Sequence, residues 1–149
     1  MQLNTSTGYA LQIMLYLVGH NRIVSSSELS EHINVSQRYL THINKKLRKG
    51  GFVESHAGIH GGYSLLKGAA DISLYDIIVL MEGRLSIPKS INKNGSENLH
   101  IVLGLMGENL ITYLQAITFD KLVDRDVNNW SVEFVNLVES HIDDLKEMT

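Results

Sequence analysis

The sequence predicts a mainly α-helical protein with a small β-hairpin, organised as a winged helix-turn-helix domain followed by a long dimerisation helix. Three observations support this fold class. Three consecutive segments within residues 5–49 place apolar side chains at the spacing of amphipathic helices. After Gly51 the pattern changes to short β-type segments on either side of a glycine-rich stretch. A longer segment, residues 96–117, carries apolar residues alternately four and three apart.

Composition narrows the classes of protein. With 149 residues and 44% hydrophobic content, the chain can form one well-packed domain, or a small domain with an appendage. It contains no cysteine, which excludes disulfides, thiolate zinc sites, cysteine nucleophiles and cysteine-held iron–sulfur clusters. The apolar stretch from Tyr9 to Val18 is too short to span a bilayer and lacks the flanks of a signal peptide. We therefore expect a cytoplasmic protein with no membrane partner.

The charge is distributed unevenly along the chain. Residues 1–67 carry seven Lys and Arg against three Glu, which gives +4, and the remainder carries six against thirteen acidic residues, which gives −7. The basic half can face a polyanion while the acidic half stays clear of it. The alternative interpretation is that these basic residues only form a solvent-exposed face and bind no polyanion.

The first predicted helix begins at Thr5 or Thr7, either of which can act as N-cap, and ends at Gly19. Its apolar positions follow the i, i+3, i+4, i+7 spacing: Ala10, Ile13, Met14 and Leu17. Ser25 and Glu28 then fit a capping box, in which the hydroxyl and the carboxylate each bind the other residue's backbone N–H. This box opens a short helix that buries Leu29 and Ile33.

After a tight turn at Asn34-Val35, Ser36 can cap a third helix that runs to Lys49. Its apolar stripe comprises Leu40, Ile43 and Leu47. Gly50-Gly51 supplies a left-handed stop. Two short helices joined by such a turn, after a longer supporting helix, make a helix-turn-helix.

The segments 52–56 and 63–66, FVESH and YSLL, are predicted to be the strands of a hairpin, and the intervening AGIHGG supplies glycines for the turn. A hairpin after three helices is the wing of a winged helix. A metal site at His56 and His60 is disfavoured because Glu54 is the only nearby carboxylate. A phosphate-binding loop is disfavoured because no Lys-Ser or Lys-Thr follows the glycines. No catalytic constellation is apparent, so we expect neither an enzyme nor a bound cofactor.

Ser73 and Asp76 begin a predicted fourth helix that ends near Gly83. We divide the chain into a DNA-binding domain, a linker loop and a helical dimerisation region: residues 1–83, 84–95 and 96–149. The predicted dimer seam comprises Leu99, Leu103, Met106, Leu110, Tyr113 and Ile117. A short helical turn at 118–123 and a last helix with Val135, Val138, Ile142 and Leu145 on one side complete the chain.

The third helix suits a DNA major groove, because its polar face is basic and no acidic residue occurs from Ser36 to Gly51. Near its start, Gln37, Arg38, Thr41 and His42 can reach base edges. Phosphates would be contacted by Lys45, Lys46 and Lys49 and by the hydroxyls of Ser36 and Tyr39. In the wing, the predicted DNA contacts are His56, Gly58, His60 and Gly61. An exposed basic helix alone would explain the charges, but the flanking helix and hairpin favour DNA.

Most of the chain resembles the Rrf-type winged-helix repressors that include IscR, NsrR and CymR. The resemblance covers MQLNTSTGYALQIMLYL at the start, VSQRYLTHINKKLRKGGFVESHAGIHGGYSL over the third helix and wing, and the blocks DISLYDIIVLMEG and ITFDKLV. It implies a transcriptional repressor that acts as a homodimer, formed through the long helix, on a palindromic operator. The two winged helices would then lie about 34 Å apart. The controlling signal stays open between a small-molecule effector and a protein partner.

The chain departs from this family at three points. Many members hold an iron–sulfur cluster on three cysteines in the segment equivalent to residues 84–108, where this chain has none. Ala57 stands where the wing usually carries arginine, and Ser6-Thr7-Gly8 replaces a common Lys-Gly-Arg. The resemblance therefore implies a cluster-free regulator. A winged-helix protein-interaction module without specific DNA binding is the alternative.

Overall fold

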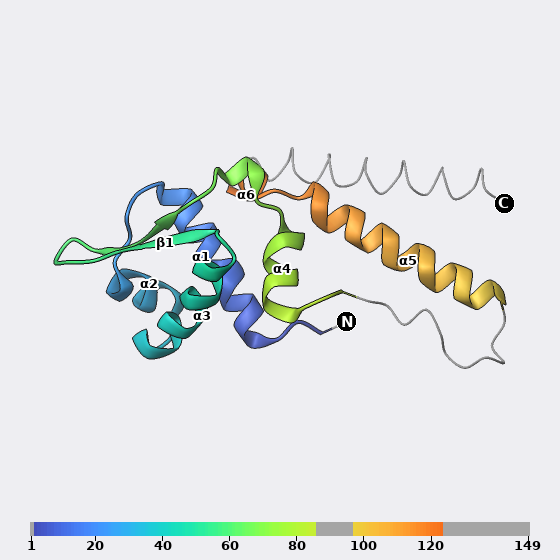
Figure 1. Cartoon of the computed structure of the whole chain (residues 1–149), viewed down its shortest axis with the longest axis horizontal. Coiled ribbons are helices and arrows are strands. Elements are labelled where there is room, and N and C mark those ends of the chain that lie inside the picture. The colour runs from blue at the N-terminus through green and yellow to red at the C-terminus, as the bar shows by residue number, and fades with distance from the viewer. Residues whose placement is uncertain (1, 86–96, 124–149) are drawn as a thin grey trace.

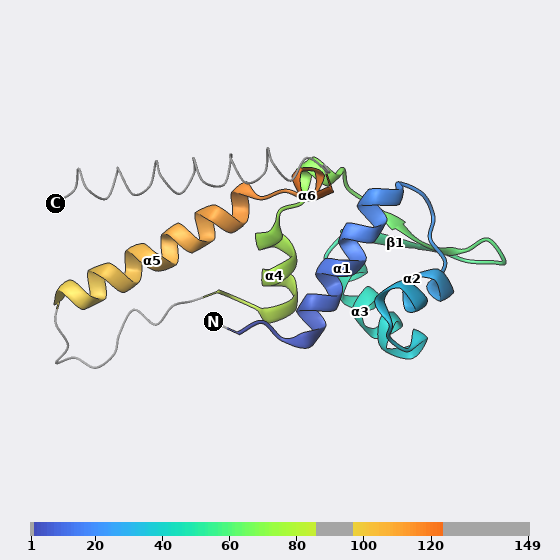
Figure 2. The same ribbon diagram turned by 180° about the vertical axis from the view of Figure 1, so that it is seen from behind.

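The computed structural model describes residues 2–85 and 97–123, and the predicted fold class is confirmed (Figure 1). At one end of the molecule a two-stranded antiparallel sheet lies along one side of the helices and projects beyond them, and a long helix extends from the other end (Figures 1 and 2). The elements in chain order are α1 Thr5–His20, α2 Ser26–Ile33, α3 Gln37–Lys49, β1 Val53–His56, β2 Gly62–Leu65, the 3-10 helix η1 Ala69–Asp71, α4 Leu74–Glu82, α5 Glu97–Ala116 and α6 Phe119–Val123. The last predicted helix and most of the predicted linker lie outside the described residues.

The core forms where the predicted apolar stripes of the first three helices meet. These stripes are buried: Ala10, Ile13, Met14, Leu17, Leu29, Ile33, Leu40, Ile43 and Leu47. They share one cluster with residues of the hairpin and of α4. Because α1 packs against α2, α3 and α4, it is the support on which the helix-turn-helix is built.

The start of α1 differs from the prediction. Asn4 is the N-cap residue, rather than Thr5 or Thr7, and its own side chain makes no cap hydrogen bond. Instead the carboxylate of Glu82, at the end of α4, accepts from the backbone N–H and the side-chain amide of Asn4, each at 2.7 Å. The hydroxyl of Thr7, which is fully buried, donates to the same carboxylate. A distant acidic residue therefore holds this helix end, which local sequence cannot reveal.

The helix stops also differ in detail. α1 continues past Gly19 to His20, because Asn21 adopts the left-handed conformation that the stop requires (φ 47°). At the end of α3, Gly50 remains right-handed with φ −73°, and only Gly51 is left-handed with φ 76°.

The predicted starts of α2 and α4 have different outcomes. At Ser73 and Asp76, which were predicted to begin the fourth helix, a reciprocal capping box is present and begins α4. At the start of α2, the hydroxyl of Ser25 accepts from the N–H of Glu28 as predicted. The reciprocal half is wrong, because the Glu28 carboxylate accepts hydrogen bonds from Tyr16 and Arg22 instead. Tertiary partners thus outcompete the local one.

The wing is a four-pair antiparallel hairpin that runs from Val53 opposite Leu65 to His56 opposite Gly62. β2 also pairs on its other side, where Tyr63 and Val24 exchange backbone hydrogen bonds of 2.9 and 2.8 Å. The hairpin is therefore anchored to the chain between α1 and α2, and its tip projects beyond the helices (Figure 1).

The chain after α5 returns to the first part of the molecule. α5 ends at Ala116, so Ile117, the last predicted seam residue, lies outside the helix and its carbonyl accepts from the N–H of Leu74 at 2.9 Å. Phe119 in α6 is fully buried in the core, and α6 packs against α1. In the described ranges, no helix is both long and apolar enough to cross a membrane.

Candidate nucleic-acid interface

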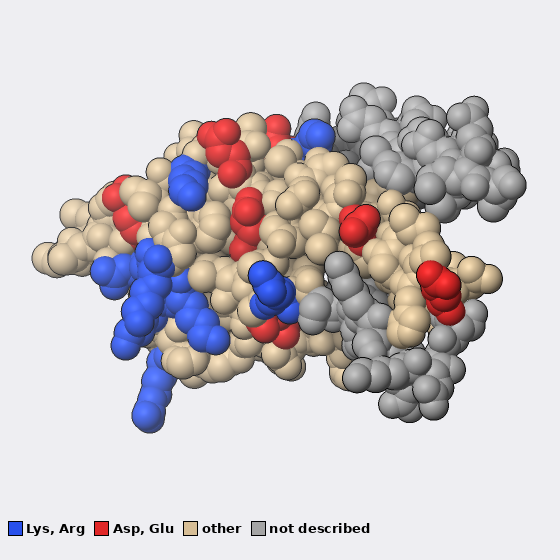
Figure 3. Space-filling model, turned by 45° about the vertical axis from the view of Figure 1, so that its right-hand side comes forward, with Lys and Arg blue, Asp and Glu red and all other residues tan. Residues whose placement is uncertain are grey.

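α3 carries nearly all of the unpaired positive charge in the first half of the chain. Its basic residues are Arg38, Lys45, Lys46, Arg48 and Lys49. Figure 3 shows lysine and arginine side chains gathered on one side of the molecule, below the protruding hairpin. The other two cations of residues 1–67 are engaged elsewhere: Arg22 pairs with Glu28, and the Lys67 ammonium lies 4.8 Å from the centre of the Phe52 ring.

The start of α3 leaves polar side chains free for a partner. The hydroxyl of Ser36 accepts from the N–H of Tyr39 at 3.1 Å and so fixes the first turn. Gln37, Arg38 and His42 are exposed, as predicted base-reading residues must be. These side chains follow each other on the outer face of the helix, away from the buried stripe.

Two predicted contact residues of α3 already have intramolecular roles. The Tyr39 ring packs edge-on against Tyr9, with ring centres 5.8 Å apart, which leaves the hydroxyl as the part able to reach a phosphate. The hydroxyl of Thr41 donates to the carbonyl of Gln37 at 2.8 Å, so towards a base it can serve only as an acceptor in this conformation.

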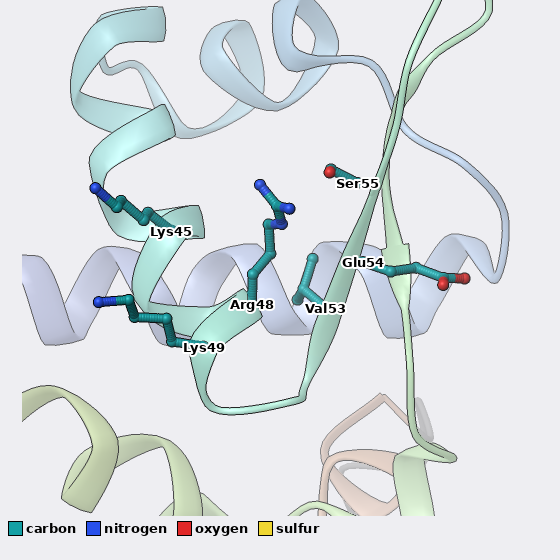
Figure 4. A pocket seen from close by; sticks show the side chains of 6 residues that line it. All are labelled: Lys45, Arg48, Lys49, Val53, Glu54 and Ser55. Atoms are coloured by element: carbon teal, nitrogen blue, oxygen red, sulfur yellow. The ribbon is translucent and has the colours of Figure 1, made fainter.

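The end of α3 and the first strand of the wing enclose a cationic cleft of about 450 Å³. Lys45, Arg48 and Lys49 line one side of this cleft (Figure 4). Val53 and Ser55 of β1 line the other, while the Glu54 carboxylate points away from the three cations (Figure 4). Three positive charges without an inward-facing carboxylate form a site that suits an anion such as a backbone phosphate.

Arg48 is a candidate contact that the sequence prediction omitted. The prediction ranked residues by their position opposite the apolar stripe, but the cleft exists because β1 folds against the end of α3. The lack of any acidic residue from Ser36 to Gly51 was the available signal, since it applies to Arg48 as much as to Lys45.

Lys46 faces a different part of the molecule. The pKa of Glu82 is lowered, chiefly by the hydrogen bond from Thr7 and by that from the N–H of Asn4, and the charge of Lys46 also contributes. Lys46 therefore lies within electrostatic reach of the end of α4 and is absent from the residues that line the cleft.

In the wing, the structure separates the two predicted histidines. The Nε2 atom of His56 lies 2.8 Å from the hydroxyl of Ser64 across the hairpin and 3.5 Å from Glu54 Oε1. His60 is exposed in the turn at the tip. His56 thus has an internal role, and His60 is the histidine positioned to meet a partner.

The glycines at the tip are required by the hairpin itself. Gly58 has φ 99°, which favours glycine. A Cβ atom on Gly61 would lie 2.2 Å from the carbonyl oxygen of His56. The close approach at Gly61 is therefore to the end of β1 within the same hairpin, which explains that glycine without a contact to DNA.

The ion pair between Arg22 and Glu28, beside α2, changes the pKa of the groups around it. Hydrogen bonds from Arg22 first, and then from Tyr16, lower the pKa of the Glu28 carboxyl from 4.5 to about 2. The hydrogen bond that the Tyr16 hydroxyl donates to Glu28 also raises the pKa of Tyr16. This cluster joins α1 to α2 and takes Arg22 out of the cationic surface.

Comparison with known proteins defines the family. A model of the Rrf2 family, described as an iron-dependent transcriptional regulator, matches residues 3–125. The chain belongs to the Rrf2 family of transcriptional regulators. It is 30% identical over 131 residues to the HTH-type transcriptional regulator IscR of Erwinia tasmaniensis, which covers 83% of this chain and 79% of that protein.

Solved structures of this Rrf2-family fold superpose well. CymR, the global cysteine regulator of B. subtilis, matches with a TM-score of 0.76 and 25% identity over 83% of this chain and 96% of that one. IscR from T. potens matches with a TM-score of 0.67 and 28% identity over 83% and 86%. The predicted family is thereby confirmed, and these relatives are regulators rather than enzymes.

The iron dependence in the family description does not fit the residues described here. The whole chain lacks cysteine. Within residues 2–85 and 97–123, no group of three or more His, Asp or Glu side chains could hold a metal ion.

Proposed function

We propose that this chain is a sequence-specific DNA-binding transcriptional repressor that acts as a homodimer on a palindromic operator without an iron–sulfur cluster. The observation that carries the proposal is the acid-free outer face of α3 together with the cationic cleft that α3 forms with β1. Membership of a family of transcriptional regulators supports it.

In this proposal the start of α3 enters the major groove. Arg38 reads guanine and Gln37 reads adenine through paired hydrogen bonds, with Thr41 and His42 beside them. Lys45, Arg48 and Lys49 bind a backbone phosphate in the cleft, and Lys46 approaches a neighbouring phosphate. The wing tip, with His60 and the glycines, follows the adjacent backbone.

The homodimer would form through α5, which has no buried residue in the described chain. Leu99, Val102 and Met106 are 46%, 51% and 57% exposed and lie three and four positions apart on one helix face. A second copy that packed the same stripe would remove this apolar surface from water. Leu103, Leu110 and Tyr113 are half-buried within the chain and would flank the contact.

The dimer can be tested with Met106→Asp, because this exposed side chain can be changed without opening the core. The expected result is a monomer in sedimentation equilibrium, since a carboxylate would otherwise be buried without a partner. Gln115→Glu introduces the same charge at an exposed position on the opposite face of α5 and should leave the dimer intact. An intact Met106→Asp dimer would place the interface elsewhere. We also propose that residues 1–83 form the DNA-binding domain, residues 84–95 a linker loop and residues 96–149 the dimerisation region.

DNA binding is tested by selection of bound fragments from a random pool, followed by titration at several salt concentrations. We expect one enriched palindrome, with log K falling by about 0.9 for each phosphate neutralised as log salt rises. Lys45→Ala should reduce this slope by about 0.9 per half-site, whereas Lys121→Ala in α6 should not change it.

A chain that selects no sequence over random DNA at low salt would refute the proposal. It would then favour the alternative, a winged-helix module that binds protein. Repression is tested separately with a promoter that contains the selected palindrome. Expression from this promoter should rise when the gene that encodes the chain is deleted.

A further inference from the structure

The wing tip presents an apolar side chain to solvent. Ile59 is 99% exposed, the largest value among the exposed large hydrophobic residues of the described chain. It lies with His60 at the corner of a turn that is closed by a hydrogen bond of 3.0 Å from Gly61 N–H to the Gly58 carbonyl. Tight turns usually carry Gly, Asn, Asp, Ser or Pro at such positions, so a β-branched apolar residue has no local explanation here.

The hairpin behind Ile59 is anchored through its second strand. A Cβ on Gly62 would lie 2.1 Å from the carbonyl oxygen of Val24, and Tyr63 forms a backbone bridge with Val24. Within the hairpin, a Cβ on Gly61 would meet the His56 carbonyl. An anchored hairpin can place one tip side chain in a groove with less loss of conformational entropy than an unattached loop.

The tip is continuous with the proposed DNA interface. β1 forms one wall of the cationic cleft through Val53 and Ser55, and the same strand leads directly to the tip (Figures 1 and 4). No Lys, Arg, Asp or Glu occurs from Ala57 to Gly62. A phosphate held in the cleft would place the tip, with Ile59 and His60, against the groove that borders that backbone.

We propose that Ile59 enters the DNA minor groove beside the segment bound by α3 and makes the protein discriminate against guanine there. This inference rests on the proposed function. The minor groove distinguishes base pairs mainly by the 2-amino group of guanine, which is a hydrogen-bond donor that projects from the groove floor. An isoleucine side chain cannot accept that hydrogen bond, and the amino group also occupies the space that the side chain would fill.

Base analogues test this mechanism directly. In the palindrome selected by the protein, each A·T pair that flanks the major-groove site is replaced in turn by 2,6-diaminopurine·T, which adds only the minor-groove amino group. Each flanking G·C pair is likewise replaced by inosine·C, which removes only that group. At one position per half-site, we expect diaminopurine to weaken binding by about five- to tenfold and inosine to bind as adenine does.

Variants then assign the effect to Ile59. In Ile59→Ala the penalty for diaminopurine should fall below about twofold. Overall affinity should fall by about five- to tenfold per wing, because three carbons that would be about half-buried in the groove are lost. The salt slope should be unchanged because no ionic contact is removed. Leu66→Ala, which shortens a 54% exposed side chain just beyond β2, is the matched control and should keep the full discrimination.

The outcomes separate the two proposals. A chain that selects no DNA overturns the proposed function and this inference with it. A chain that selects a palindrome, but shows no effect of the amino group, overturns the inference alone. Discrimination that survives in Ile59→Ala also overturns it and would leave Ile59 available for a protein contact instead. Ile59 is fully exposed, so loss of folding does not confuse these results.

Discussion

Replacing Phe119 should show that the chain beyond the long helix stabilises the DNA-binding part. Phe119 is fully buried among core residues contributed by α1–α4 and the hairpin, although it follows α5 in sequence. Phe119→Ala removes an aromatic ring from a packed interior and leaves a cavity. Substitutions of this kind cost about 3–5 kcal/mol.

The backbone around Phe119 indicates how far this effect spreads. Its N–H donates to the carbonyl of Ile72 at 3.0 Å, and the adjacent Ile117 carbonyl accepts from Leu74. Loss of the ring would weaken these contacts between α6 and the start of α4. For a chain of this size, the energy corresponds to a fall in Tm of about 10–15 °C.

Urea denaturation is the suitable assay. If the dependence of the unfolding free energy on urea concentration (the m-value) is unchanged, a shifted midpoint reports lost stability rather than a changed unfolded state. Leu66→Ala, in an exposed position, should cost less than about 0.5 kcal/mol and serves as the control. A loss below about 1 kcal/mol for Phe119→Ala would refute the reasoning. The segment after α5 would then fold independently of the winged helix.

Three further predictions concern the wing, the pH dependence of stability and the cleft. Gly62→Ala should lower the free energy of unfolding in urea by about 3 kcal/mol or more, because the added Cβ would meet the Val24 carbonyl. Gly58→Ala has open space around the Cβ and should cost only about 1–2 kcal/mol, from its positive φ. The pKa of Glu28 is lowered to about 2, so its contribution to stability is present above pH 4.5 and is lost as the pH falls towards 2. Thermal unfolding of Glu28→Gln should lack this part of the pH profile. Arg48→Ala should reduce the salt slope of DNA binding by about 0.9 per half-site, and an unchanged slope would remove Arg48 from the interface.

The sequence predicts those parts of the fold that depend on one helix or one turn. The stripe Leu40, Ile43 and Leu47 identifies the buried face of α3, because helical periodicity alone determines which side chains share a face. The N-cap at Ser36 is likewise local, since the hydroxyl binds an N–H three residues on. The buried stripe and the position of the N-cap together determine which side chains of α3 are exposed.

The features that the sequence did not reveal depend on contacts between distant segments. Glu28 was predicted to complete a capping box, but Arg22 and Tyr16 provide stronger partners once α1 and α2 pack together. Arg48 becomes a candidate only because β1 folds beside it. His56 was predicted as a DNA contact, and its Nε2 atom lies 2.8 Å from the hydroxyl of Ser64, a diagonal neighbour that the register places opposite Glu54.

The same kind of contact determines how the long helix can communicate with the DNA-binding elements. The chain leaves the winged helix after Glu82, whose carboxylate holds the start of α1. It returns at α6, where Val123 lies beside Gly19 near the end of α1. α1 in turn packs against α3. A shift of α5 that carries the end of α4 or α6 with it would therefore move α1. A movement of α1 displaces the face that supports α3, the proposed recognition helix. Glu82→Gln keeps the acceptor oxygen but removes the charge. It should weaken the first attachment while leaving Phe119 in place. Because Lys46 is within electrostatic reach of Glu82, the matched variant is Asn4→Ala, which removes a hydrogen bond to Glu82 without changing a charge. An effect on DNA affinity that both variants share can be assigned to the attachment at the start of α1.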